Sequence, residues 1–441
     1  MVASVLRCLR LMGALLLVIA LPGHANTLTI EEIASSKGIK AWLVTERSVP
    51  VVAIRYAFLG GALQDPMHKE GLARFLAATL PEGAGDLPAA AFKQRYLSLG
   101  SRLSATSSKE AVSGVLLSLR DQLSRSVGLF HLMVTSPRFD SDAIERKRAE
   151  LLADLATEAH APAKLALNRW YAEAFAGHSY ARPQQGTPDS IAAITTDDVK
   201  AQHGRLFAKD VLRVVIVGDI DRSAAAEVLD RAFGDLPDAA QIIPIDKIAP
   251  RSISAPVVVD MDQPTSSAVF GVPSLSADDP DFPALQILNY IVGSGDFDSR
   301  LMDEIRIKRG LAYAINTRLI SDSLAPLVLG EMTTKNENMG IALDVVREIF
   351  ASIARDGPEE AQFETAKRYL TGSFLLDFDS SARMADSLLT LWLRDKTPDY
   401  LTTRNRMIDA VRLDDVRRVA GNLFARERFI VAVVGKPKLG Q

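Results

Sequence analysis

The stretch TTDDVKAQHGRLFAKDVLRVVIVGDI, Thr195–Ile220, decides the fold because its plan recurs near the end of the chain. The second copy, VRLDDVRRVAGNLFARERFIVAVVGKP, runs from Val411 to Pro437. Three matched pairs share an offset of 217 positions: Asp198 and Asp415, Phe207 and Phe424, Gly218 and Gly435 (415−198, 424−207, 435−218). A constant offset without a gap predicts an internal duplication.

Each copy predicts a helix capped by Thr or Asp, followed by a β-branched strand that ends at a glycine. Upstream, DAIERKRAELLADL around Glu145 and AQFETAKRYLTGSF around Glu364 are both amphipathic and also match. Strands mixed with long helices in each half predict an α+β fold of two duplicated domains, each a sheet covered by helices.

The segment from Asp235 to Pro256 contains four prolines and no helical period, which is typical of a linker. We therefore expect an N-terminal domain over residues 26–234, a linker over 235–256 and a C-terminal domain over 257–441.

The first residues predict a cleaved secretory signal over residues 1–25. Arg7 and Arg10 precede an apolar run from Leu11 to Leu21, and a small-residue ending follows at Ala25. The run is about a dozen residues long, shorter than the roughly 20 that span a bilayer. We expect a secreted chain without a membrane segment after cleavage.

Composition excludes several kinds of chemistry. The single cysteine, Cys8, lies in the signal, so the mature chain forms no disulfide and has no thiol nucleophile or ligand. Without Arg7 and Arg10, Lys+Arg falls from 51 to 49 against 54 Asp+Glu, a net charge of −5 (49−54). Nothing in this balance indicates a nucleic-acid partner.

The stretch GLARFLAATLPEG, Gly71–Gly83, matches the residues around a zinc-binding motif but lacks the two histidines and the glutamate of that motif. In H-x-x-E-H, two histidines four residues apart share one helix face, with a glutamate just before the second. Arg74, Ala77 and Ala78 occupy these three positions here.

These surroundings resemble the pitrilysin family of zinc metallopeptidases, which includes the mitochondrial processing peptidase. Three further stretches carry the resemblance: FLGGALQDP, GHSYARPQQGTPDSIAAIT and GSGDFDSRLMDEIRIKRGLAYAI. The resemblance covers nearly the whole mature chain and implies two duplicated domains with mostly antiparallel sheets.

The resemblance places the family's third zinc ligand, a glutamate on a later helix, at Asp154. A single carboxylate cannot replace a three-ligand set, and Arg74 adds a positive charge, so we expect no metal in this chain. His160 is the nearest other candidate ligand, but no histidine pair has ligand spacing, and a structural role is favoured for His178. No phosphate loop and no Gly-x-Ser-x-Gly elbow occurs.

Unlike the first half, the second half keeps residues that match active-site positions of the family. Arg306 and Tyr313, within R-x-x-x-G-L-A-Y, match the pair that the family's second domain contributes to the active site. The resemblance implies that they bind substrate and stabilise the charge on the scissile carbonyl oxygen. It also implies a flexible loop at Gly293 and Gly295.

We therefore expect a zinc-less subunit of a heterodimeric metallopeptidase, with Arg306 and Tyr313 serving the active site of a homologous H-x-x-E-H partner that binds the zinc and cleaves peptides. The expected location is the bacterial periplasm. Three alternatives stay open: a structural or assembly protein, a peptide-binding chaperone homodimer, and a hydrolase with an unrecognised site.

Overall fold

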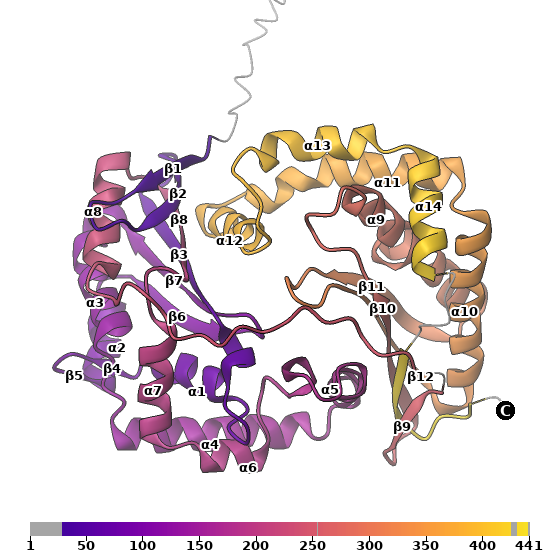
Figure 1. Cartoon of the computed structure of the whole chain (residues 1–441), viewed down its shortest axis with the longest axis horizontal. Helices are drawn as coiled ribbons and strands as arrows, with labels where there is room; N and C mark the ends of the chain where they lie inside the picture. The colour runs from indigo at the N-terminus through magenta and orange to yellow at the C-terminus, as the bar shows by residue number, and fades with distance from the viewer. Residues whose placement is uncertain (1–28, 254, 425–429, 440–441) are drawn as a thin grey trace, which may run out of the picture.

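The computed structural model describes residues 29–253, 255–424 and 430–439. The predicted signal, residues 1–25, and residues 425–429 of the second repeat lie outside these ranges. Two sheets, each with helices packed against it, lie side by side in the molecule (Figure 1). The predicted α+β class is confirmed. In the described ranges, no helix is both long and apolar enough to cross a membrane.

The N-terminal sheet has the strand order β1-β2-β8-β3-β7-β6, and every neighbouring pair except β2 and β8 is antiparallel. Its strands are β1 (Glu31–Ala34), β2 (Lys40–Thr45), β3 (Val51–Leu59), β6 (Arg102–Ser107), β7 (Ala111–Leu119) and β8 (Leu212–Gly218). The central strands β3 and β8 read as nearly continuous apolar runs, VVAIRYAFL and LRVVIVG, because both faces of the sheet are covered.

The C-terminal sheet has the order β11-β12-β10-β13-β9, again with one parallel pair, β13 and β9. Its strands are β9 (Val257–Asp260), β10 (Thr265–Pro273), β11 (Ala312–Ile320), β12 (Leu327–Lys335) and β13 (Ile430–Gly435). Strand β11 is an edge strand, so one side of its backbone has no strand partner among the described residues. The described residues between helix α8 (Arg222–Phe233) and β9 form no helix or strand.

The remaining elements cover the sheets or connect the strands. In the first half they are η1 (Gly61–Gln64), α1 (Leu72–Thr79), the short strands β4 (Gly83–Ala84) and β5 (Leu87–Pro88), α2 (Ala89–Ser98), η2 (Arg120–Gln122), α3 (Leu123–Thr135), α4 (Ser141–Glu158), α5 (Pro162–Ala174), η3 (Ser179–Ala181), α6 (Pro188–Ala193) and α7 (Thr196–Leu206). In the second half they are α9 (Phe282–Asn289), η4 (Tyr290–Ser294), η5 (Asp296–Asp298), η6 (Met302–Lys308), η7 (Asn336–Asn338), α10 (Met339–Asp356), α11 (Glu360–Ser373), η8 (Phe374–Phe378), α12 (Ser381–Trp392), α13 (Tyr400–Ala410) and α14 (Leu413–Phe424).

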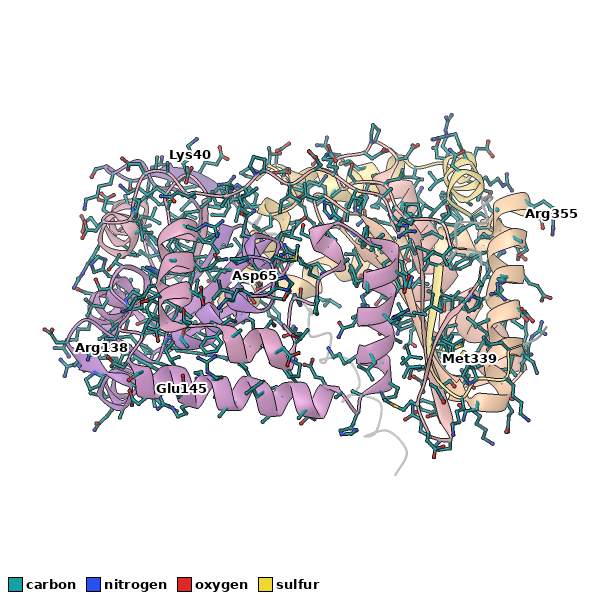
Figure 2. All side chains as sticks on the ribbon, turned by 60° about the horizontal axis from the view of Figure 1, so that its bottom comes forward. Lys40, Asp65, Arg138, Glu145, Met339 and Arg355 are labelled. Carbon is teal, nitrogen blue, oxygen red and sulfur yellow. The ribbon has the colours of Figure 1, made fainter. Side chains whose placement is uncertain are left out.

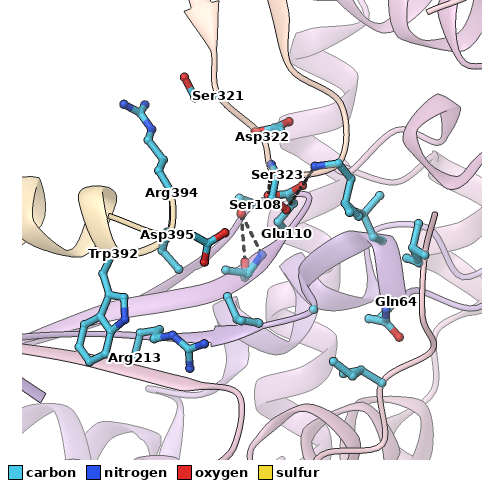
Figure 3. A pocket seen from close by; sticks show the side chains of 18 of the residues that line it. Gln64, Ser108, Glu110, Arg213, Ser321, Asp322, Ser323, Trp392, Arg394 and Asp395 are labelled. Atoms are coloured by element: carbon cyan, nitrogen blue, oxygen red, sulfur yellow. Dashed lines mark hydrogen bonds between the residues drawn. The ribbon is translucent and has the colours of Figure 1, made fainter. Parts of the chain in front are cut away.

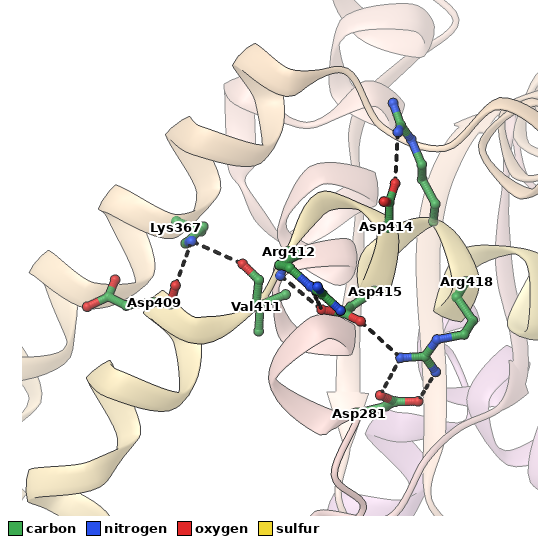
Figure 4. A network of polar contacts seen from close by, with 9 residues as sticks. Asp281, Lys367, Asp409, Val411, Arg412, Asp414, Asp415 and Arg418 are labelled. Atoms are coloured by element: carbon green, nitrogen blue, oxygen red, sulfur yellow. Dashed lines mark hydrogen bonds and ion pairs between the residues drawn. The ribbon is translucent and has the colours of Figure 1, made fainter.

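The repeat predicted from sequence folds the same way twice. Helix α7 leads into β8, and helix α14 precedes β13. Even the cap is repeated: the Thr195 N–H donates to Asp198 Oδ2 at 2.7 Å, and the Arg412 N–H donates to Asp415 Oδ2 at 3.0 Å. In the second copy, Arg418 also bridges to Asp281 at the start of α9, with Nη2 2.8 Å from Oδ1 (Figure 4). The polar network therefore fixes α14 against α9.

One helix from each half packs on the sheet of the other half. Helix α5 packs on β13 and β10, where the Trp170 indole N–H donates to the Ile430 carbonyl at 3.1 Å. Helix α12 packs on β8 and β3 (Figure 1). At the end of this helix, Trp392 stacks on Trp42 of β2 with ring centroids 4.9 Å apart. The two halves therefore interlock through equivalent helices of the repeated unit.

A buried carboxylate fixes the start of α1. Asp65 accepts hydrogen bonds from the N–H groups of Gly71 and Ala73, both at 2.9 Å. Figure 2 shows Asp65 within the N-terminal half and Lys40 and Arg138 at its periphery. Burial raises the pKa of Asp65 to about 7, although the two N–H donors act to lower it. The cap sets the direction of the helix that carries Arg74, Ala77 and Ala78.

We predict that Asp65→Ala destabilises the protein by about 2 kcal/mol, as expected for loss of a helix cap that leaves N–H groups unpaired. The free energy of unfolding in urea provides the measurement. Asp189→Ala, an exposed carboxylate in the first turn of α6, is the matched control and should change stability by less than about 0.5 kcal/mol. Equal effects of the two substitutions would refute the capping role.

Candidate functional site

The positions of the degenerate zinc motif lie together on α1 and α4. Arg74 Nη2 is 2.8 Å from Asp154 Oδ2, and Arg74 Nη1 also donates to the Gln185 carbonyl at 3.3 Å. The Arg74 side chain is 17% exposed and that of Asp154 is 52% exposed, so the ion pair opens to solvent on one side. The structure thus brings together Arg74 and Asp154, two positions 80 residues apart that the sequence matched to one site.

This arrangement does not fit zinc. Ala77 is buried, Ala78 is half-buried, and neither methyl group can coordinate a metal. The guanidinium of Arg74 pairs with the Asp154 carboxylate, the position that the resemblance matched to the third ligand. Among the described residues, no group of three His, Cys, Asp or Glu side chains is placed to hold a metal ion.

The histidines considered from sequence have other environments. His160 lies exposed in the turn after α4. His178 precedes η3, where its Nδ1 accepts a hydrogen bond from the Tyr180 N–H at 3.2 Å and its ring stacks on that of Tyr180. A structural role therefore accounts for the contacts of His178.

A second ion-pair cluster fastens the same two helices, and the sequence analysis missed it. Glu82, just after α1, lies 2.6 Å from Arg146 and 3.2 Å from Lys147, both on α4. Burial acts to raise the pKa of Glu82, but the two cations outweigh it and the pKa is lowered. Glu82 belongs to the stretch PEG, which in the sequence marked only the end of the motif frame, so its role appears only from its contacts.

The second candidate pair, Arg306 and Tyr313, is also brought together. Arg306 lies on η6 and Tyr313 on the edge strand β11, with the guanidinium 4.5 Å from the centre of the tyrosine ring. Phe297 of η5 also lies close, with its ring centre 4.9 Å from the same guanidinium. Two aromatic rings therefore contact the Arg306 guanidinium, and these cation–π contacts favour its position beside Tyr313. The contribution of Phe297 was missed from sequence.

Backbone geometry explains the direction of Tyr313. The pairing of β11 with β12 shifts register between Ala312 and Ala314, so Tyr313 is the extra residue of a β-bulge. Bulges redirect a side chain and are common beside active sites. Tyr313 is 79% exposed, unusual for a large aromatic side chain. It borders a groove of about 800 Å³ whose lining includes Arg306, Asn316, Glu331 and Lys335.

Gly293 and Gly295, expected in a flexible loop, lie within and just after the helical turn η4. Gly293 lies within η4 and is buried, and a Cβ there would come within 2.5 Å of Thr317 Oγ1. A Cβ on Gly295 would come within 2.7 Å of the Tyr290 carbonyl oxygen. Close packing explains both glycines, and their predicted flexibility stays a prediction.

A polar cluster joins the two halves where the β11–β12 turn meets the start of β7. Glu110 accepts hydrogen bonds from the N–H groups of Ser323 (3.0 Å) and Leu324 (3.1 Å) (Figure 3). It also accepts one from the Tyr180 hydroxyl. Burial, and then the charge of Glu110, raise the pKa of neighbouring Asp322 to about 7, against the effects of Lys109, Arg394 and Tyr180. This cluster has no signature in the sequence because its members are far apart in the chain.

We predict that Asp322 makes stability fall as the pH rises from about 4 to about 7. Its pKa is raised from 3.8 to about 7, so the folded state holds the proton more tightly, and this contribution is lost as the pH passes the folded pKa. Asp322→Asn should flatten the profile of melting temperature against pH in this window. Each pKa unit corresponds to about 1.4 kcal/mol.

Asp65 titrates in the same window, so the test is the difference between wild type and variant. Burial lowers the pKa of Lys109 to about 8, which places its titration above the window. Asp189→Asn, at an exposed site, is the control. Parallel profiles for wild type and Asp322→Asn would contradict the assignment.

Comparisons with known proteins agree with this geometry. Residues 42–188 match the family model described as Insulinase (Peptidase family M16), and residues 193–370 match the model described as Peptidase M16 inactive domain. A non-peptidase homolog from Helicobacter pylori is 28% identical over 355 residues, covering 79% of this chain and 81% of the relative. An uncharacterized zinc protease of Mycobacterium leprae is 26% identical over 393 residues, covering 87% of each chain.

Among solved structures, the crystal structure of a peptidase M16 inactive domain from Pseudomonas fluorescens superposes with a TM-score of 0.87 at 26% identity. The match covers 94% of this chain and 99% of that one. The fold and the altered motif thus define an inactive-type member of a metallopeptidase fold. The chain belongs to peptidase family M16, the pitrilysin-like family that its sequence resembles.

Proposed function

We propose that this chain is the zinc-less subunit of a heterodimeric M16 metallopeptidase and supplies Arg306 and Tyr313 to the active site of an H-x-x-E-H partner. The observation that carries the proposal is the Arg306–Tyr313 pair, in which the guanidinium of Arg306 on η6 lies 4.5 Å from the ring centre of Tyr313, the bulged residue of the edge strand β11. The Arg74–Asp154 ion pair also supports the proposal that the partner binds the zinc, because two of this chain's own zinc-ligand positions form a salt bridge with each other.

The chemistry of the pair suits substrate binding in the partner's site. A guanidinium and a phenolic hydroxyl both donate hydrogen bonds, and fixed donors stabilise an oxyanion better than mobile ones. The zinc of the partner would supply Lewis-acid chemistry, while Arg306 and Tyr313 would orient the peptide carbonyl. The proposed location is the periplasm, reached through the signal over residues 1–25.

The experiment is to co-express this chain with a homologous H-x-x-E-H subunit and to measure the composition of the purified complex. The proposal predicts a heterodimer with zinc in the partner and peptidase activity, and an isolated chain without either. A stable complex without activity would favour the structural or assembly role. A homodimer that binds peptides without the partner would favour the chaperone role, and cleavage by the isolated chain would indicate an unrecognised hydrolase site.

A further inference from the structure

The groove beside Tyr313 has an uneven distribution of charge. Its volume of about 800 Å³ lies within the range of about 300–1,000 Å³ that is usual for ligand sites. Three charged side chains line it: Arg306, Glu331 and Lys335. Apart from the Tyr313 hydroxyl, the other polar side chains of the lining belong to threonines and asparagines. The balance between the three charges therefore decides which ligands the groove attracts.

The negative charge in the lining is already neutralised. Glu331 of β12 forms an ion pair with Arg318 of the neighbouring strand β11, and both side chains are only partly exposed. Arg318 lies outside the groove lining, so it compensates the carboxylate without adding a free cation to the groove. Among the described residues of the lining, Glu331 is the only carboxylate.

The two positive charges, in contrast, have no carboxylate partner. Within the described ranges, neither Arg306 nor Lys335 forms an ion pair. The acidic residues of η6 that are closest in sequence to Arg306 are Asp303 and Glu304, and both pair with Lys308 instead. The groove therefore carries a net positive charge.

Strand pairing brings Lys335 to the same end of the groove as Tyr313. Lys335 is the last residue of β12 and Tyr313 is the second residue of β11, and the two strands are antiparallel, with Thr334 opposite Ala312. Thr334 is buried whereas Lys335 is exposed, so the lysine side chain lies on the groove face of the sheet. The free ammonium group therefore lies toward the Arg306–Tyr313 pair.

We propose that Lys335 selects peptides with an acidic side chain close to the bond that is cleaved, while Arg306 and Tyr313 hold the carbonyl of that bond. A carboxylate that enters the groove pairs with the free ammonium group, whereas a basic side chain meets two uncompensated cations. This inference rests on the proposed function and adds its substrate class, peptides that are acidic near the cleavage site. Lys335 acts on specificity and not on the chemical step.

The test begins with the isolated mature chain, because the groove is formed by this chain alone. Fluorescence anisotropy measures the binding of three labelled octapeptides, built from alanine, leucine and threonine, that carry aspartate, asparagine or lysine at one central position. At low salt the aspartate peptide should bind about three- to fivefold more tightly than the asparagine peptide, and the lysine peptide should bind most weakly. High salt should reduce these differences, because it screens exposed charges.

Three variants locate the interaction. Lys335→Gln should remove most of the preference for the aspartate peptide, and Lys335→Glu should reverse it in favour of the lysine peptide. Arg318→Gln should also reduce the preference, because Glu331 then loses its partner and repels an acidic peptide. The matched control is Lys436→Gln, since Lys436 follows β13, pairs with Asp262 and lies outside the groove lining. Each variant's melting temperature confirms that it folds.

Reconstituted heterodimers separate this inference from the proposed function. The ratio of kcat/KM for the aspartate and asparagine forms of one fluorogenic peptide should change in the same order across the variants. Equal or absent binding of the three peptides by the isolated chain, or a preference unchanged in Lys335→Glu, would overturn the inference. Acid-selective binding by the isolated chain together with an inactive heterodimer would instead contradict the proposed function and leave the selectivity of the groove standing.

Discussion

Arg306→Ala and Tyr313→Phe are expected to lower the peptidase turnover of the reconstituted heterodimer by on the order of 100-fold, with assembly and partner zinc unchanged. Removing one oxyanion donor typically costs about 2.7–4 kcal/mol. Tyr313→Phe keeps the ring that stacks on Arg306 and removes only the hydroxyl, so its effect reports hydrogen bonding rather than packing.

The measurement is turnover of a fluorogenic peptide by heterodimers matched in size and zinc content. Arg309→Ala is the control, because Arg309 lies just after η6 and pairs with Glu304 outside the groove lining. If Arg306 and Tyr313 have only a structural role, the substitutions should weaken heterodimer assembly, and activity should fall only in proportion to the unassembled fraction. Wild-type turnover by both variants in fully assembled heterodimer would remove the catalytic part of the proposal and leave a scaffold.

Restoring the motif is the second large effect. Arg74→His, Ala77→Glu, Ala78→His and Asp154→Glu together are expected to convert a chain without zinc into one that binds about one zinc ion. The contact between Arg74 and Asp154 shows that α1 and α4 already place these positions face to face. Activity need not return, because groups around the ligands alter metal affinity by about 10- to 100-fold.

Elemental analysis after dialysis measures the zinc, and circular dichroism checks folding. The control is the variant with Arg74→His and Ala78→His alone, which lacks the longer carboxylate and should bind zinc more weakly. A folded quadruple variant that takes up no zinc at micromolar concentration would show that the ligand geometry has been lost. Ala77 is the position most at risk of this outcome, because it is buried and a glutamate must fit there.

The duplication and the sheet composition could be predicted because they rest on local patterns. The offset of 217 residues, the β-branched runs and the repeated caps all appear in the sequence and in the structure. The resemblance also paired Arg74 with Asp154 and Arg306 with Tyr313, and both pairs are in contact.

Other features depend on packing between distant segments. The stacking of Phe297 on Arg306, the bulge at Tyr313 and the Glu110 cluster follow from three-dimensional contacts that no short motif records. At Gly293 the missing side chain permits close approach to Thr317, another contact that the sequence does not record.

The exchange of α5 and α12 has a consequence for how this architecture arose and how it can be divided. A chain with one copy of the unit would expose an apolar sheet face to solvent. Two such chains could cover these faces by exchanging the helix, as in a domain-swapped dimer. The present molecule has the arrangement of such a dimer, with its two halves joined through the segment between α8 and β9. Cutting the chain in the linker should therefore give fragments that remain associated, whereas either fragment made alone should aggregate.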